Sequence, residues 1–204
     1  RGIETRVRFL GHLIDPRHEI PSIDLLPARC PRSTPVLYSR DEIRQLLQAT
    51  RSMPSPFRRA THETLFGLLA ATGMRVGEAI RLDARDVDWG QQLLVIRESK
   101  FRHSREVVLH ATVVRALRRY ASERGRVHAP ARSPSFFVSL TGTRLIYNNV
   151  QHTFAALLRR AGITRARARI HDLRHTFAVQ TLLRWHREGA DVEARMPMLS
   201  TSSS

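Results

Sequence analysis

Residues 69–82 read Leu-Ala-Ala-Thr-Gly-Met-Arg-Val-Gly-Glu-Ala-Ile-Arg-Leu, and they are the most informative stretch of this sequence. A helical apolar pattern from about Thr61 runs into Gly73, a typical C-terminal stop, and a short helix is predicted directly after it. Glycine lets the backbone bend there, so Arg75 can point into a cleft while Glu78, one turn later, orients it. An ordinary helix corner with a surface ion pair, which contributes roughly 0–1 kcal/mol, would explain the same residues.

The chain before this stretch divides into two parts. Residues 1–37 hold five of the ten prolines, which indicates an irregular lead-in or linker. Ser39-Arg-Asp-Glu42 then forms a capping box, and the apolar residues after it give a helix one buried face. Regular structure is therefore expected to begin near residue 39.

The chain after this stretch alternates between strand and helix patterns. Two β-like runs, 93–96 and 107–109, flank a polar, basic segment and predict a hairpin. Further helices are predicted at about 112–124, 148–161 and 171–188, with a short strand at 136–140. Asn148 and Asn149 are candidate caps of the second of these helices. The elements predict a mostly helical α+β domain with one small antiparallel sheet.

The charge of the chain restricts its partners. The 204 residues carry 34 Lys+Arg against 18 Asp+Glu, so the formal net charge is +16, which indicates a polyanion, most simply nucleic acid. A membrane surface is a less favoured partner, because no stretch of the sequence reaches about 18 apolar residues. The single cysteine, Cys30, excludes an internal disulfide and a Cys-rich metal site. The start shows no secretory pattern, so a cytoplasmic location, at the bacterial nucleoid, is expected.

Lys100 is the only lysine, and it lies at the tip of the predicted hairpin. Arginine cannot lose a proton near neutral pH, whereas lysine can, so a role as general acid would explain why arginine is not used here. Chance is an equally good explanation of a single residue.

His171-Asp-Leu-Arg174 opens the last long helix. The two outer residues lie three positions apart, on one face of a helix N-terminus that already favours anions, so together they make a plausible phosphate site. A solvated helix start is the simpler reading of this motif alone. The acidic residues form no tight cluster suited to two metal ions, so no metal is expected.

Taken in order, these motifs resemble the tyrosine recombinase (phage integrase) family. The resemblance rests on the stretch 69–82, the Lys100 hairpin and His171-Asp-Leu-Arg-His-Thr-Phe-Ala178, and it covers roughly residues 36–199. It implies the family's catalytic domain over 38–199, a remnant of the core-binding domain and linker over 1–37, and a polar tail over 200–204. The family breaks and rejoins double-stranded DNA without metal or cofactor, through a phosphotyrosyl intermediate.

The resemblance also implies roles for individual residues. Arg75 and Arg174 would clamp the non-bridging oxygens of the scissile phosphate, because paired guanidinium groups are planar and always charged. Lys100 would protonate the leaving 5′-oxygen, and His171 would act as general base or hold the proton network. Glu78 would support Arg75, and His175, beside Arg174, would also have a supporting role.

Two implied elements are missing. One is a further His or Trp, usually in a Leu-Gly-His stretch soon after the end of the matched region, and the other is the nucleophilic tyrosine on the following helix. Tyr38, Tyr120 and Tyr147 all precede His171. The expectation is therefore a fragment, truncated at both ends, that binds DNA, is inactive alone and is monomeric. It would be a remnant in a mobile element, with intact recombinase subunits as further partners. A non-catalytic DNA-binding protein that modulates an intact recombinase is the alternative. A generic RNA-associated protein is disfavoured because only 6% of residues are aromatic.

Overall fold

The computed structural model describes residues 36–97, 104–165 and 168–191. By its internal contacts the chain divides into Arg1–Thr34 and Pro35–Ser204, and every described residue belongs to the second unit. The described elements are α2 (Arg40–Ala49), η2 (Thr50–Ser52), α3 (Pro56–Thr72), α4 (Val76–Arg81), η3 (Ala84–Asp86), β1 (Val87–Asp88), β2 (Leu93–Ile96), β3 (Arg105–Val108), α5 (Ala111–Val127), α6 (Tyr147–Arg160) and α7 (Asp172–Arg187).

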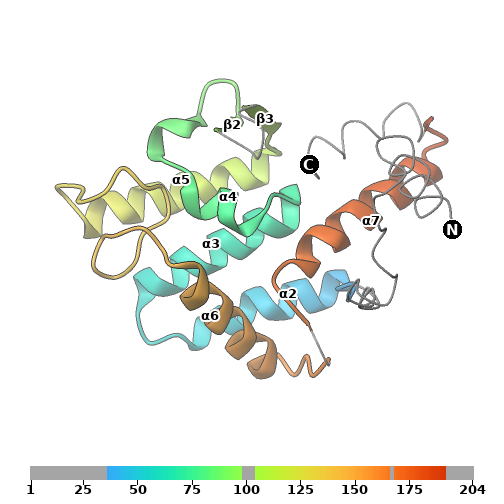
Figure 1. Ribbon diagram of the computed structural model, residues 1–204, viewed down its shortest axis with the longest axis horizontal. Coiled ribbons are helices and arrows are strands. Elements are labelled where there is room, and N and C mark those ends of the chain that lie inside the picture. The colour runs from blue at the N-terminus through green and yellow to red at the C-terminus, as the bar shows by residue number, and fades with distance from the viewer. Residues whose placement is uncertain (1–35, 98–103, 166–167, 192–204) are drawn as a thin grey trace, which may run out of the picture. The chain divides into compact units, whose positions relative to one another are not determined.

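Helix α3 is the centre of this unit. It packs against α2, α4, α5 and α7, and α6 packs against α2 and α4 (Figure 1). Leu65, Phe66 and Leu69 of α3 are almost completely buried. Because helices on several sides cover it, α3 needs apolar residues over most of its surface rather than on one stripe.

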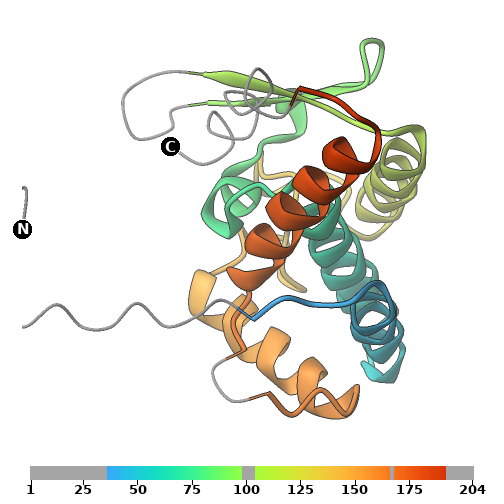
Figure 2. The same ribbon diagram turned by 90° about the vertical axis from the view of Figure 1, so that its right-hand side faces the viewer.

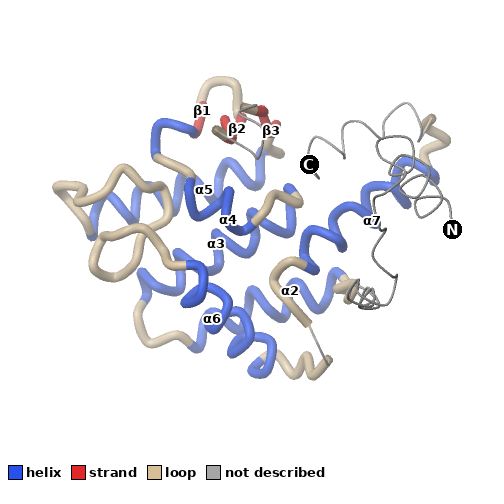
Figure 3. The backbone as a smooth tube through the Cα atoms, in the orientation of Figure 1, coloured by secondary structure: helices blue, strands red, loops and turns tan. Residues whose placement is uncertain are grey.

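The sheet is small and lies at one end of the helices (Figures 2 and 3). Its strand order is β1-β2-β3, and both pairings are antiparallel. This confirms the predicted mostly helical fold with one small antiparallel sheet. The third strand runs from Arg105 to Val108 instead of over residues 107–109, so it begins two residues earlier than predicted.

The register of β2 and β3 places Ile96 opposite Arg105 and Leu94 opposite Val107. Residues that face each other across an antiparallel pair point to the same side of the sheet. Leu94 and Ile96 are buried. Arg105 therefore occupies an inward position of the strand.

The helix ends follow local sequence signals in several cases. Ser39 and Glu42 form the predicted capping box of α2, with hydrogen bonds of 3.1 and 2.7 Å between each side chain and the other residue's backbone N–H. Helix α3 starts earlier than predicted, with Ser55 as N-cap and Pro56 in its first turn. Gly73 ends it in the left-handed conformation, as predicted, with φ of 63°.

Two local predictions were wrong. Helix α6 begins at Tyr147 after the N-cap Ile146, and no side chain caps it, so Asn148 and Asn149 lie inside the helix instead of before it. The segment 136–140 forms no strand; its neighbourhood shows only single bridges, Asp83 with Ser135 and Val138 with Arg144. The side chains of 136–138 are buried, but among the described residues this backbone pairs only through single bridges, so it lacks the ladder that defines a strand.

Candidate functional site

Arg75 lies in the turn between α3 and α4, as the N-cap of α4. Glu78, three residues later, accepts a hydrogen bond of 2.8 Å from the Arg75 backbone N–H and one of 3.2 Å from the Arg75 guanidinium. The Glu78 side chain is 2% exposed, whereas that of Arg75 is 33% exposed. The buried carboxylate therefore holds the base of Arg75 and leaves part of its guanidinium accessible.

Arg174 approaches the same turn from the first turn of α7. It is buried, and its Nη1 donates a hydrogen bond of 2.6 Å to the carbonyl oxygen of Gly73. Its Nη2 is buried and has no hydrogen-bond partner in the part of the chain that the structure describes. A buried donor without a partner is costly, so this nitrogen is suited to an anionic oxygen supplied by a ligand.

Burial and the neighbouring charged groups both affect the pKa of Arg174. The pKa of Arg174 is lowered to about 10, mainly by burial and also by the positive charges of Arg75 and Arg105, while the carboxylate of Glu78 acts in the opposite direction. Arg174 still carries its charge at neutral pH. The guanidinium groups of Arg75, Arg105 and Arg174 thus lie near the single carboxylate of Glu78. This leaves an excess of positive charge in a partly buried place.

Gly73 is required at this turn for a second reason besides its backbone conformation. A Cβ atom there would lie 2.3 Å from Cδ1 of Phe177, on α7. The ring of Phe177 therefore packs directly on the turn. This contact brings the start of α7, with Arg174, against the end of α3.

Two histidines lie beside Arg174. The rings of His171 and His175 are 4.9 Å apart and nearly perpendicular. Partial burial lowers the pKa of His171, as do the positive charges of His175, Arg174 and Arg75, and Asp172 acts in the opposite direction. His171 is therefore neutral near pH 7, the state in which an imidazole accepts a proton.

His171 and His175 have the i, i+4 spacing of a two-histidine metal pair. Within residues 36–97, 104–165 and 168–191, however, no three His, Cys, Asp or Glu side chains lie together as a metal site would need.

The structure brings together Arg75, Glu78, Arg174, His171 and His175. Lys100 lies outside the described residues. Sequence reasoning missed Arg105, whose Nη2 donates a hydrogen bond of 2.8 Å to Oε2 of Glu78. The signal that could have found it is a basic residue alternating with inward-facing Val107 on the same strand.

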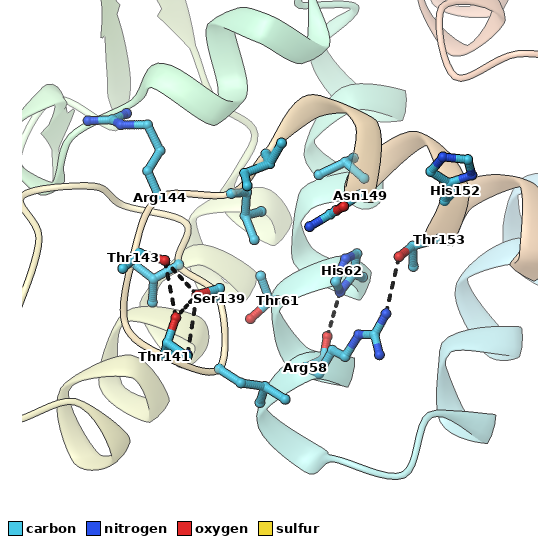
Figure 4. A pocket seen from close by; sticks show the side chains of 15 residues that line it. Arg58, Thr61, His62, Ser139, Thr141, Thr143, Arg144, Asn149, His152 and Thr153 are labelled. Carbon is cyan, nitrogen blue, oxygen red and sulfur yellow. Dashed lines mark hydrogen bonds between the residues drawn. The ribbon is translucent and has the colours of Figure 1, made fainter.

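A separate hollow of about 440 Å³ lies between α3, α6 and the segment 138–146 (Figure 4). Its lining includes His62, whose Nδ1 hydrogen-bonds the Arg58 carbonyl oxygen at 2.8 Å, and Thr153, which accepts from Arg58 at 3.4 Å. Neither Arg75 nor Arg174 lines it. The arginine cluster therefore lies apart from this hollow.

None of the helices that the structure describes combines the length and the apolar composition needed to cross a bilayer.

Known proteins resemble this chain in sequence. The model of the phage integrase family matches residues 37–198. A protein of Sinorhizobium fredii named as an integrase/recombinase, y4rB, is 43% identical over 92% of this chain and 63% of its own length. The tyrosine recombinase XerC of Chlamydia caviae is 27% identical over 87% of this chain and 53% of its own. The chain thus spans about half to two thirds of the length of these curated relatives.

Solved structures show the same fold. The crystal structure of XerA recombinase superposes with a TM-score of 0.63 at 30% identity, covering 78% of this chain and 53% of that one. A lambda integrase dimer bound to a COC′ core site superposes with a TM-score of 0.63 at 16% identity, covering 92% of this chain and 66% of that one. From its motifs, its fold and these matches, the chain belongs to the phage integrase family of tyrosine recombinases, of which it represents the catalytic domain.

Proposed function

We propose that this chain binds double-stranded DNA and holds one backbone phosphate between Arg75 and Arg174, as the phosphate-binding part of a site-specific recombinase. The observation that carries the proposal is the buried Nη2 of Arg174, which has no hydrogen-bond partner among the described residues and lies in a cluster with excess positive charge. A phosphate diester supplies both the negative charge and the acceptor oxygens that this cluster lacks.

In this proposal the two guanidinium groups stabilise the charge that develops on the non-bridging oxygens as the phosphorus becomes five-coordinate. The arginines perform this task with permanent charges, so the step needs no metal ion from this chain. For cleavage, a tyrosine from outside these 204 residues would attack the phosphorus and give its proton to neutral His171. The bond from phosphorus to the 5′-oxygen would break, and Lys100 would protonate that oxygen. Glu78 and His175 position Arg75 and His171.

None of the three tyrosines is proposed as the nucleophile. Tyr38 and Tyr120 are buried, and their hydroxyl groups hydrogen-bond the Arg169 carbonyl oxygen and the Val138 N–H, at 3.3 and 3.1 Å. Tyr147 is exposed but opens α6, before α7 in the chain. The proposal is therefore that these 204 residues bind DNA and do not cleave it unaided.

DNA binding is tested by fluorescence anisotropy with a labelled 30-base-pair duplex. Arg75→Gln and Arg174→Gln should each weaken the affinity by about tenfold, since a charge-assisted phosphate contact is lost. Arg115→Gln is the matched control: it removes an exposed arginine of α5 and should change the affinity about twofold or less. If all three variants lose affinity equally, Arg75 and Arg174 do not act as a specific phosphate clamp. Arg174→Lys, which keeps the charge without the planar fork, replaces Arg174→Gln if that variant unfolds.

The absence of unaided cleavage is tested with nicked duplexes that tile the ends of the genetic element carrying the gene. We expect bound DNA but no covalent protein–DNA band after denaturing electrophoresis. A covalent band that maps to Tyr38, Tyr120 or Tyr147 would overturn this part of the proposal and leave the clamp itself intact.

The tyrosine positions also favour a second function, occupation of DNA sites against an intact recombinase. A chain that binds without cleaving competes for shared sites. Excess chain should then inhibit an active relative on the same DNA, and the Arg174→Gln variant should inhibit less. Equal inhibition by both proteins would argue against this role.

A further inference from the structure

Arg105 opens β3, and its guanidinium lies against the same carboxylate that supports Arg75. The Arg105 side chain is 12% exposed and that of Glu78 is 2% exposed, so their 2.8 Å ion pair is removed from solvent. Its Nε is also buried and has no partner in the described part of the chain. An arginine side chain is rarely buried to this extent unless its charge is paired.

The two carboxylate oxygens of Glu78 accept hydrogen bonds from different donors. Oε1 accepts from the Arg75 guanidinium at 3.2 Å, and Oε2 accepts from the Arg75 backbone N–H and from Arg105, both at 2.8 Å. Arg105 is the one of these donors that comes from another element, 27 residues along the chain. Without Arg105, the donors to this carboxylate among the described residues would all belong to Arg75, the residue that the carboxylate orients.

The charge of Arg105 also reaches the second clamp residue, since it is one of the positive charges that act on Arg174. The register explains how: Arg105 shares the inward side of the sheet with Val107, Leu94 and Ile96, at the edge of the core. Loss of Arg105 would therefore disturb both arginines from one position.

We infer that Arg105 is a positioning residue of the phosphate clamp, which acts through Glu78 to hold the Arg75 guanidinium in the orientation that receives a DNA phosphate. The inference rests on the proposed function. It also links β3, five residues after Lys100 in the sequence, to the turn that carries Arg75.

The test is a double-mutant cycle in the anisotropy assay with the 30-base-pair duplex. Arg105→Gln should weaken DNA binding by about tenfold, within the range of couplings between neighbouring residues. Arg97→Gln is the matched control. Arg97 directly follows β2 and pairs with buried Asp86, and its substitution removes the same charge as Arg105→Gln. It should change the affinity about twofold or less.

The cycle separates positioning from direct DNA contact. In a Glu78→Gln background, Arg105→Gln should cost no more affinity than Arg97→Gln, because the carboxylate through which Arg105 acts is gone. An undiminished loss in that background, or equal effects of Arg105→Gln and Arg97→Gln in the original chain, would overturn the inference. Thermal unfolding followed by circular dichroism checks that each variant is folded at the assay temperature, and Arg105→Lys serves if Arg105→Gln is not.

Failure of this inference is distinguishable from failure of the proposed function. If Arg75→Gln and Arg174→Gln weaken binding and Arg105→Gln does not, the clamp stands without Arg105. If none of the three weakens binding relative to its control, the clamp itself is wrong.

Discussion

Gly73 shows how much one residue contributes at this site. It ends α3 with a φ of 63°, its missing side chain leaves room for the Phe177 ring, and its carbonyl oxygen accepts the hydrogen bond from Arg174. Each of these three roles depends on the other two, because the backbone direction at Gly73 decides both where the carbonyl points and how closely α7 approaches.

Gly73→Ala should lower the free energy of unfolding by about 2–4 kcal/mol, since a left-handed alanine is strained and its Cβ would overlap Phe177. Urea denaturation measures the change. Gly67→Ala is the control within the same helix: a Cβ there meets nothing within 4 Å, so stability should stay the same or rise by up to ~1 kcal/mol. Equal effects at both positions would contradict the packing described for the turn.

At the scale of the element, helices α2 and α6 differ in how they begin. The side chain of Ser39 accepts a backbone N–H at the start of α2, whereas Ile146 precedes α6 with extended backbone, 61% exposed, and offers no acceptor. Burial of Val150, Phe154 and Leu157 holds α6 in place despite the missing cap. Tertiary packing therefore outweighs the local preference that favoured Asn148 or Asn149 as a cap.

Ile146→Ser should stabilise the protein relative to Ile146→Ala by about 1 kcal/mol, because serine supplies the missing N-cap acceptor while both variants remove the same apolar surface. Chemical denaturation of the two variants gives the difference directly. Identical midpoints and slopes for the two would mean that α6 does not start at Tyr147.

For the whole molecule, the net charge of +16 spread over 204 residues sets how binding responds to salt. The clamp accounts for only a few of the arginines. Some of the others pair with carboxylates, as Arg97 does with Asp86, and the remaining excess of positive charge is available to the other backbone phosphates of a duplex. Such contacts release condensed counterions and carry no sequence information.

Affinity for a 30-base-pair duplex of arbitrary sequence should therefore fall steeply with salt. If about six phosphates are contacted, the loss between 50 and 200 mM NaCl is on the order of 10³-fold. Anisotropy titrations at several salt concentrations give the slope of log affinity against log salt. A loss below about tenfold would show that the charge is not directed at DNA.

The sequence alone determined what depends on neighbours along the chain. The capping box at Ser39, the stop at Gly73, the pairing of Arg75 with Glu78 and the helix opened by His171 and Arg174 all involve residues within a few positions, so local geometry fixes them. The positive charge is likewise a property of composition.

Only the tertiary structure decided which distant residues meet. Arg174 reaches the Gly73 carbonyl across 101 positions, and Arg105 reaches Glu78 across 27. The second contact depends on a strand register, because a shift of one residue would turn Arg105 away from Glu78 to the opposite side of the sheet. The alternation of Arg105 with Val107 along β3 indicates that they share a face, but it does not say which residues of β2 lie opposite them. That register follows from packing Leu94, Ile96 and Val107 against the core, and this packing turns a basic residue of an expected loop into part of the candidate site.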